Sequence, residues 1–368
     1  MIPLEVIQEH VLPYLHNGKC LRLVSRNFLR MSCDRLRFSK IVITPFEHIK
    51  HIKISENDSL MNNLDKMINL KTFHCMHEID FMKRISNRKH IKEINVTTEL
   101  RDFSSLTDVR SMTVYGLSES NDSNRSRSMQ PDISFPPNLE YLKLSMSGLD
   151  ILKISGNFWC LKTVSIEWYT LTNKNIICFE NVEKITLSST RVTSLKMLKK
   201  CKVLGLISCD DISDDSFSFD MAARIEKLYL NRTEITDFTK FVNCNEINLY
   251  QVEHLPTDMN VKKLVYSRCN HKKIDLRSLK HLEYLNCYGD NKITEEMINM
   301  ENLTYLDCSF TRICDLSQAM KLKTLVHYGN VKKFPTQEMT VYNKFKNNNM
   351  QDDFYIFEFI DDDSDDNQ

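Results

Sequence analysis

Apolar residues recur along this chain in six-residue strings with leucine-like side chains at the first, fourth and sixth positions. Clear examples are Leu139-Glu-Tyr-Leu142-Lys-Leu144 and Leu303-Thr-Tyr-Leu306-Asp-Cys308. Within each string the later positions alternate between apolar and polar residues, which is the period of a strand with one buried face. Each string therefore predicts a short β-strand that begins near its third residue.

The strings begin about every twenty residues, which gives fourteen units. Their first residues are Ile49, Leu70, Ile91, Val109, Leu139, Leu161, Val182, Cys201, Ile225, Cys244, Val261, Leu282, Leu303 and Leu322. This spacing and pattern resemble leucine-rich repeats, whose period is roughly 20 to 29 residues. The resemblance implies an α/β solenoid, a leucine-rich-repeat horseshoe with parallel β-strands on its concave face. The alternative is an ordinary α/β protein with coincidental spacing.

The eighth position after each unit's start supports the repeat interpretation. In nine of the fourteen units it is Asn, Cys, Thr, Ser or Asp, and it includes Thr190, Cys209, Thr311 and Asn330. An inward polar side chain at this place satisfies backbone groups where the chain leaves its strand. Segments such as Ile235-Thr-Asp then resemble the place where a leucine-rich repeat turns to its outer side.

Composition shifts divide the chain into three parts. Residues 1–40 lack the repeat, residues 41–335 carry it, and residues 336–368 are expected to form a C-terminal cap followed by an acidic disordered tail. Residues 118–134 lengthen one unit with a stretch rich in Ser and Asn, which predicts an inserted flexible loop.

The first forty residues predict two helices. The motifs that carry a further resemblance are Pro3-Leu4-Glu5-Val6-Ile7 and Leu23-Val24-Ser25-Arg26-Asn27-Phe28. They resemble the F-box, which implies docking onto a Skp-type adaptor of a cullin-based ubiquitin ligase. The segment from Leu15 to Val24 is about two residues shorter than in that family. The resemblance implies adaptor contacts by Pro3, Ile7, Leu12, Leu15, Val24 and Phe28. The alternative is that these helices only cap the solenoid.

Composition excludes several other classes. With 7 glycines, the chain has few residues for the Gly-rich loops that cradle phosphates or dinucleotides, and no nucleophile or metal motif stands out, so we expect no enzyme, no cofactor and no metal. In His74-Cys75-Met76-His77-Glu78, Cys75 points inward and His74 outward, so they do not converge on one ion. No apolar run spans a membrane, and Met1-Ile-Pro-Leu-Glu5 is unlike a secretory signal.

Cysteine and charge patterns narrow the setting. Seven of the 12 cysteines occupy inward repeat positions, namely Cys75, Cys201, Cys209, Cys244, Cys269, Cys287 and Cys308. This favours packing over disulfides, and hence a reducing compartment, cytoplasmic or nuclear. Residues 1–350 hold 49 basic and 41 acidic side chains, while eight acidic residues lie from Gln351 onward. That balance is too dilute for nucleic-acid binding.

Tyrosines mark the candidate binding surface. The residues two, four and six places after each unit's start point away from the core, and they include Tyr229, Tyr250, Tyr284, Tyr288, Tyr305 and Tyr328, with Asn286 and Asp307 among their neighbours. Tyrosine is frequent at interface hot spots. The alternative is that these rings only stabilise the sheet through cross-strand pairs.

The functional expectation is a non-catalytic substrate receptor. Its N-terminal motif would bind a Skp-type adaptor and cullin, and its concave face would bind a protein substrate, the chain acting as a monomer within that complex. The alternative is a free-standing leucine-rich-repeat scaffold or regulator of an enzyme, with the N-terminal helices acting only as a cap.

Overall fold

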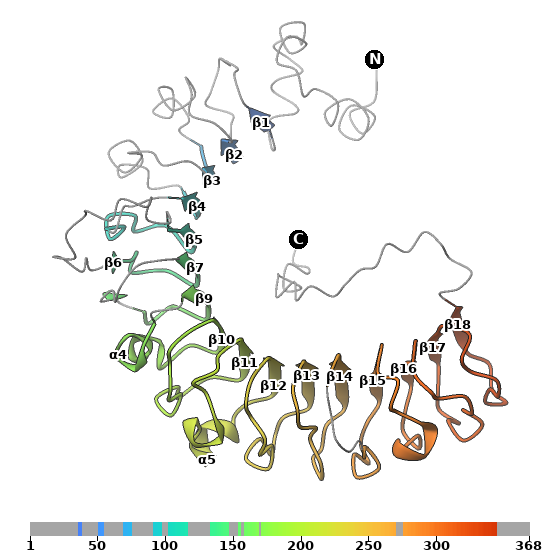
Figure 1. Ribbon diagram of the computed structural model, residues 1–368. Helices are drawn as coiled ribbons and strands as arrows, with labels where there is room; N and C mark the ends of the chain where they lie inside the picture. The colour runs from blue at the N-terminus through green and yellow to red at the C-terminus, as the bar shows by residue number, and fades with distance from the viewer. Residues whose placement is uncertain are drawn as a thin grey trace, which may run out of the picture. The chain divides into compact units, whose positions relative to one another are not determined.

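The computed structural model describes residues 36–38, 51–54, 69–75, 91–97, 102–116, 133–146, 154–155, 158–168, 171–269 and 275–343. The chain divides into two compact units, residues 1–235 and 236–368. Each unit is a ladder of short parallel strands (Figure 1).

The first unit pairs its main strands in chain order, except that β6 and β8 form a separate parallel pair. The described strands are β1 (Leu36–Phe38), β2 (His51–Ile54), β3 (Thr72–Cys75), β4 (Glu93–Thr97), β5 (Ser111–Tyr115), β6 (Ile133–Ser134), β7 (Tyr141–Met146), β8 (Ile154–Ser155), β9 (Thr163–Trp168), β10 (Lys184–Ser188), β11 (Val203–Ile207) and β12 (Lys227–Asn231).

The second unit continues the same plan, again with consecutive strands paired in parallel. Its described strands are β13 (Glu246–Tyr250), β14 (Lys263–Ser267), β15 (Tyr284–Asn286), β16 (Tyr305–Asp307), β17 (Thr324–His327) and β18 (Thr340–Asn343).

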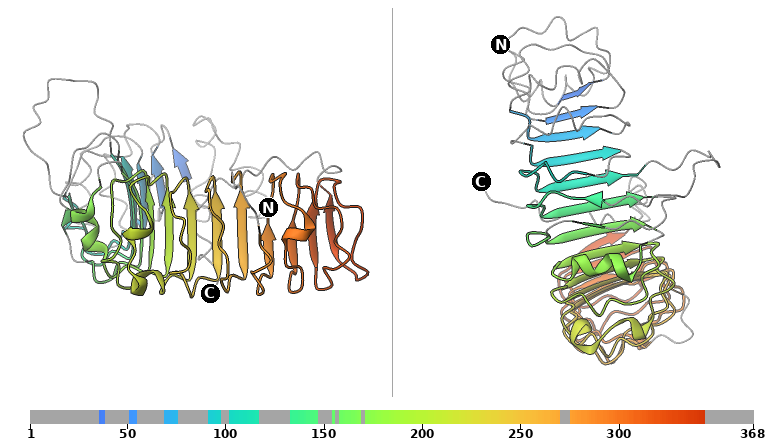
Figure 2. Two further views of the ribbon diagram at one scale, coloured as in Figure 1. Left: turned by 60° about the horizontal axis from the view of Figure 1, so that its bottom comes forward. Right: turned by 90° about the vertical axis from the view of Figure 1, so that its left-hand side faces the viewer.

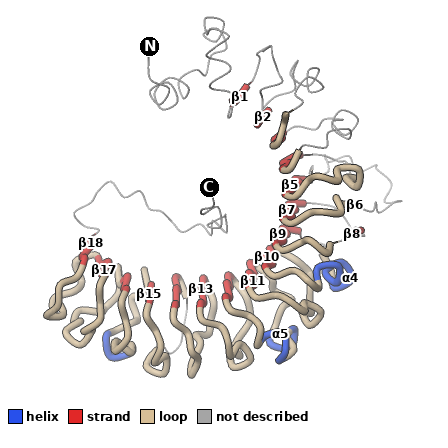
Figure 3. Tube along the Cα trace, turned by 180° about the vertical axis from the view of Figure 1, so that it is seen from behind, coloured by secondary structure: helices blue, strands red, loops and turns tan. Residues whose placement is uncertain are grey.

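The segments that return from one strand to the next lie on the opposite side of the core from the exposed strand face (Figures 2 and 3). They are mostly turns with short helical pieces. These pieces are α4 (Asn173–Ile176), η5 (Ile177–Phe179), η6 (Asp214–Ser216), α5 (Phe219–Ala222) and η7 (Glu295–Met297). Ser218 caps α5, because its side chain accepts the Met221 N–H.

The predicted repeat register is confirmed. In all fourteen predicted units a strand begins two residues after the predicted start, from β2 to β17. The first, fourth and sixth positions face inward. In the unit that begins at Leu303, for example, Leu303, Leu306 and Cys308 are each fully buried. The chain is therefore a parallel β-solenoid, whose core is a stack of these side chains.

The strand ladder extends past the repeat segment that the sequence predicts. β1 lies within residues 1–40 and pairs with β2, and β18 lies within residues 336–368 and pairs with β17. At the end of the predicted inserted loop, β6 pairs with β8, and residues 118–132 lie outside the described part of the chain. The two helices expected before residue 30 and the tail after residue 343 also lie outside it.

A left-handed residue ends each of eight consecutive strands. The residue seven places after the start of each of these units has a positive φ; these residues are Ser189, Ser208, Arg232, Gln251, Arg268, Gly289, Phe310 and Gly329. Only two of the eight are glycine, the residue that adopts this conformation without steric cost. The turn is therefore imposed by the ladder itself and is tolerated by very different side chains.

Position eight supplies the inward polar side chain that the sequence predicts. In the last full unit, the Asn330 amide donates to the carbonyls of Cys308 (3.0 Å) and Ile313 (2.9 Å). The hydroxyl of Thr311 donates to the carbonyl of Cys308 at 2.7 Å. The thiol of Cys209 donates to the carbonyl of Leu187 at 3.4 Å. These bonds satisfy backbone groups that the strands leave open.

Candidate protein-binding face

All six predicted tyrosines lie on the exposed face of the strands, and each is partly exposed. Tyr229 belongs to the first unit, and the other five belong to the second. Their placement follows from strand alternation, because the side chains between them face the core. The second unit arranges its aromatic side chains in two rows.

The first row runs across the starts of β13 to β16. The Lys263 ammonium forms an ion pair with the Glu246 carboxylate at 3.0 Å, and it lies 5.3 Å from the centre of the Tyr284 ring. The Tyr284 and Tyr305 rings stack with centres 4.1 Å apart and planes 1° apart. A cation over a ring and a stacked ring pair are both attractive. The row is thus held in place by its own neighbours.

The second row lies where the strands end. The Phe310 ring packs edge-on against Tyr288 at 5.4 Å and stacks on Tyr328 at 4.2 Å. Phe310 is 44% exposed, which is high for so large an apolar side chain. We call these five residues the aromatic face. Tyr284 and Tyr305 belong to its first row, and Tyr288, Phe310 and Tyr328 belong to its second.

Phe310 is the member of the aromatic face that the sequence did not predict. It lies seven residues after Leu303, two residues past the inward Cys308, so strand alternation predicts that it faces the core. Its φ of 59° turns the chain into the left-handed region and brings the ring beside the tyrosines. The sequence does not predict this turn, because Gly or Asn usually occupies a left-handed position and Phe310 is neither.

Asn286 and Asp307 lie between the two rows and are buried, at 5% and 3% exposed, although their positions were expected to be open. Asn286 accepts the Tyr288 N–H at 3.1 Å, and Asp307 accepts the Ser309 N–H at 3.0 Å. Each side chain bends back to bond the backbone two residues later, which accounts for its low exposure. Their role is to fix the backbone under the second aromatic row.

The cysteines predicted to pack inward are buried, as expected. Burial raises the pKa of the Cys201 and Cys308 thiols to about 12. A thiol that stays protonated is a poor nucleophile and a poor metal ligand. Cys75 is buried, whereas His74 is partly exposed and bonds Glu93 at 2.9 Å, so the two diverge as predicted. Among the described residues, no group of three or more His, Cys, Asp or Glu is placed to hold a metal.

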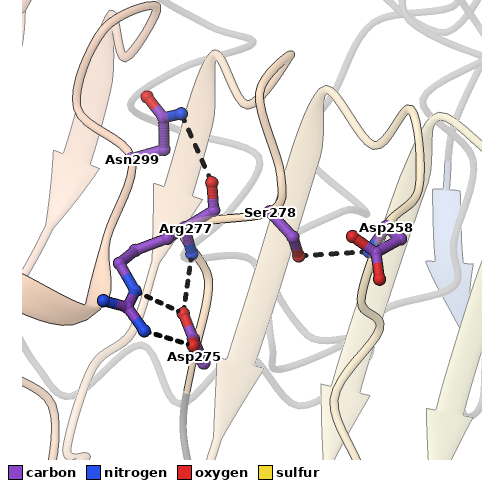
Figure 4. Close-up of polar contacts among 5 residues, drawn as sticks. All are labelled: Asp258, Asp275, Arg277, Ser278 and Asn299. Atoms are coloured by element: carbon purple, nitrogen blue, oxygen red, sulfur yellow. Dashed lines mark hydrogen bonds and ion pairs between the residues drawn. The ribbon is translucent and has the colours of Figure 1, made fainter.

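The outer side of the second unit is built from polar turns (Figure 4). Asp275 accepts the Arg277 N–H at 3.2 Å and pairs with its guanidinium at 2.7 and 2.9 Å. The Ser278 hydroxyl accepts the Asp258 N–H at 3.1 Å, which links this turn to the previous one. Such Asx turns close the returning loops, so this side is occupied by bonds that hold the scaffold.

The residues predicted to contact an adaptor, Pro3, Ile7, Leu12, Leu15, Val24 and Phe28, lie outside the described residues. None of the helices in the described ranges has the length and hydropathy of a membrane-crossing segment.

The strand register, the stacked core and the polar position eight together define a leucine-rich-repeat-type parallel β-solenoid. No family model matches the chain, and no curated protein does. Among solved structures it is similar to an internalin (inlF) from Listeria monocytogenes, with 15% identity and a TM-score of 0.49, covering 76% of this chain and 87% of that one. It is also similar to the functional domain of InlJ from Listeria monocytogenes, with 12% identity and a TM-score of 0.43, covering 77% of this chain and 68% of that one.

Proposed function

We propose that this protein is a non-catalytic recognition solenoid that binds a protein partner through its exposed strand face. The aromatic face of the second unit is the centre of that contact. The observation that carries the proposal is the partly exposed row of Tyr288, Phe310 and Tyr328, because aromatic side chains gathered on a sheet surface are typical of interface hot spots.

The order within the aromatic face favours binding. The Tyr284 and Tyr305 rings are stacked, and Lys263 covers the other side of Tyr284. These side chains are restricted before a partner arrives, so they lose little rotamer freedom on binding. The ring edges and phenol hydroxyls are the parts left to meet the partner, and each offers both apolar area and a hydrogen-bonding group.

Position-specific crosslinking separates a binding role from a purely structural one. Thr324 pairs in register with Tyr305 and faces the same side, whereas Gln318 is exposed on an outer turn. A photo-reactive amino acid at position 324 should crosslink an identifiable partner in cells that make the protein, and the same group at position 318 should not. Tyr328→Ser should then weaken the purified complex about tenfold or more, as for a hot-spot residue. Equal crosslinking from both positions would argue for a structural role alone.

A free-standing scaffold or regulator of an enzyme is the form of this function that we favour, because its supporting residues all lie in the repeats. A substrate receptor of a cullin-based ubiquitin ligase is the second candidate, and the motif Pro3-Leu4-Glu5-Val6-Ile7 with Leu15 and Val24 supports it. Co-purification distinguishes them. A receptor should recover a Skp-type adaptor and a cullin, and Leu15→Asp should abolish that recovery while the circular dichroism of the repeats stays unchanged. Recovery of partner without adaptor favours the scaffold.

The thiols are consistent with a reducing setting. Seven cysteines at inward positions are buried and form no disulfide, and burial holds the pKa of Cys287 well above its ordinary value. We therefore place the protein in the cytoplasm or nucleus.

A further inference from the structure

A row of small side chains crosses the exposed strand face of the first unit. Ser165, Thr186 and Gly205 are paired in register on β9, β10 and β11. The row ends at Lys143 on β7 and at Tyr229 on β12, which are paired with Ser165 and Gly205. We name Ser165, Thr186 and Gly205 the small-residue row.

Gly205 makes this row unusually low. A Cβ at position 205 would lie 3.0 Å from the Thr186 hydroxyl, so even alanine is tight there. Glycine inside a strand often marks a place where another backbone approaches closely. The other repeats mostly have larger side chains at the equivalent place, four residues after the unit's start, for example Tyr229 and Asn286. The nearest atoms to a Cβ at position 205 belong to the Thr186 side chain, Thr186 is 7% exposed and Gly205 is buried, so the row is a low, closely packed strip between Lys143 and Tyr229.

Lysines border this row. Lys143 lies at one end of it, and Lys184 and Lys227 lie two residues before Thr186 and Tyr229 on the same face. Within the described ranges, neither Lys143 nor Lys184 has a hydrogen-bond or ion-pair partner. By contrast, Lys162 and Lys202 lie one residue after the start of their units, and each pairs with a glutamate at 3.5 Å.

The acidic groups of this face are few. Glu167 on β9 lies beyond the small-residue row and accepts a hydrogen bond from Ser145 at 3.2 Å. Glu93 is farther along the sheet on β4, and it bonds His74. The surface around the small-residue row thus carries unneutralised positive charge. An unpaired ammonium group gains from an added carboxylate without losing an existing partner.

We propose that the small-residue row and its lysines bind an extended, acidic segment of the partner protein, which rests on the proposed function. The main chain of the segment lies over Ser165, Thr186 and Gly205, and its carboxylates meet Lys143 and Lys184. Strands are about 4.8 Å apart, so lysines two strands apart are roughly 10 Å from each other across the sheet. A chain in the polyproline II conformation has three residues per turn and rises about 3.1 Å per residue, so every third side chain faces the same way, about 9 Å from the last. A segment with an acidic side chain at every third position therefore matches the spacing.

The direct test is fluorescence anisotropy of the full chain with a labelled synthetic peptide that has glutamate at every third position. Binding should weaken about two- to fivefold for Lys143→Gln or Lys184→Gln, as for partly exposed ion pairs, and more for the double variant. The matched controls are Lys162→Gln and Lys202→Gln, which remove the same charge from lysines already paired with Glu140 and Glu226. They should change the affinity by less than twofold.

A steric variant tests the contact independently of charge. Ser165→Phe places a ring on the small-residue row and should weaken binding at least tenfold, with little change in the salt dependence. Salt should weaken the wild-type complex, because the lysines are exposed to solvent.

Four results would overturn the proposal. One is equal loss for the face lysines and the control lysines. Another is unchanged binding when the glutamates of the peptide are replaced by glutamine. The third is tighter binding of a single-stranded oligonucleotide than of the peptide, which would assign the face to phosphates. Crosslinking from position 324 does not depend on these lysines, so this proposal and the proposed function fail separately. A synthetic peptide of residues 351–368 that outcompetes the probe would identify the chain's own acidic tail as an occupant and so overturn binding to a partner segment.

Discussion

Replacing Asn330 with leucine should destabilise the second unit more than any other single polar substitution in its described turns. The Asn330 amide donates to the Cys308 and Ile313 carbonyls at 3.0 and 2.9 Å, and its oxygen accepts the Tyr328 N–H at 3.2 Å. Leucine is of similar size but offers none of these bonds. Two carbonyls and one N–H would be left without their partner.

The magnitude follows from the number of bonds. A hydrogen bond contributes about 0.5–1.5 kcal/mol net, and a buried group left unpaired costs more. Asn330 is partly exposed, so water compensates in part. We therefore expect a loss of about 2–4 kcal/mol in the free energy of unfolding. Asn302→Leu is the control, because the Asn302 amide donates to a single carbonyl, that of Lys280 at 2.8 Å, and its oxygen accepts only the solvent-exposed Lys321 ammonium at 2.6 Å, so it should cost about 1 kcal/mol or less.

Urea denaturation followed by circular dichroism measures both variants, with equal slopes required for the comparison. Asn330→Asp adds a second readout. It keeps the acceptor for Tyr328 but turns an oxygen toward two carbonyls, which raises the pKa of the introduced carboxyl in the folded state. Its deficit should therefore shrink as the pH falls and the carboxyl takes up a proton. If Asn330→Leu costs no more than Asn302→Leu, the polar ladder does not stabilise the strand ends.

Three further predictions concern single sites. Burial lowers the pKa of His327 below its ordinary 6.5, so the unfolded chain binds more protons at this residue than the folded chain does. Stability should therefore fall as the pH drops below about 6.5. His327→Leu should flatten that part of the curve when urea midpoints are measured over a pH series. Gly289→Ala should lower the free energy of unfolding by about 1 kcal/mol through its φ of 79° alone, since nothing lies near the added Cβ. Ser208→Gly should raise it by up to about 1 kcal/mol, because glycine adopts the left-handed conformation without steric cost. Thermal midpoints that move in the opposite directions would contradict this. A double-mutant cycle at Tyr284 and Tyr305 should give a coupling of about 0.5–1.5 kcal/mol, and a value near zero would mean that the stacked pair adds nothing beyond burial.

The strand positions and the inward side chains could be predicted from the sequence because they follow from side-chain alternation. The apolar residues at positions one, four and six must share a face, so the register of β2 to β17 is fixed by pattern alone. Positions that depend on several strands at once could not be predicted. Asp307 is buried and bonds the Ser309 N–H, and Phe310 is exposed at a left-handed turn.

The ends of the ladder were missed for separate reasons. β18 lacks a full string, because Glu338 and Asn343 hold its first and sixth positions, and pairing with β17 is what makes it a strand. β1 belongs to a string that the repeat count left out, Cys33-Asp34-Arg35-Leu36-Arg37-Phe38. Val341 on β18 is 44% exposed, so little core burial identifies it in the sequence. Of the candidate surface, the six tyrosines could be located in advance, but their division into two rows required the pairing of Tyr284 with Tyr305 and the insertion of Phe310 beside Tyr328.

The left-handed residue that closes each of eight strands has a consequence for how such a protein can change. Successive units differ in length, from 17 residues between Cys244 and Val261 to 24 between Cys201 and Ile225, yet every strand begins at the same place in its unit. The fixed turn confines insertions and deletions to the far side of each coil. Mutations can therefore change the contact residues of one strand at a time, while the distance between neighbouring strands, which a ligand must match, stays constant.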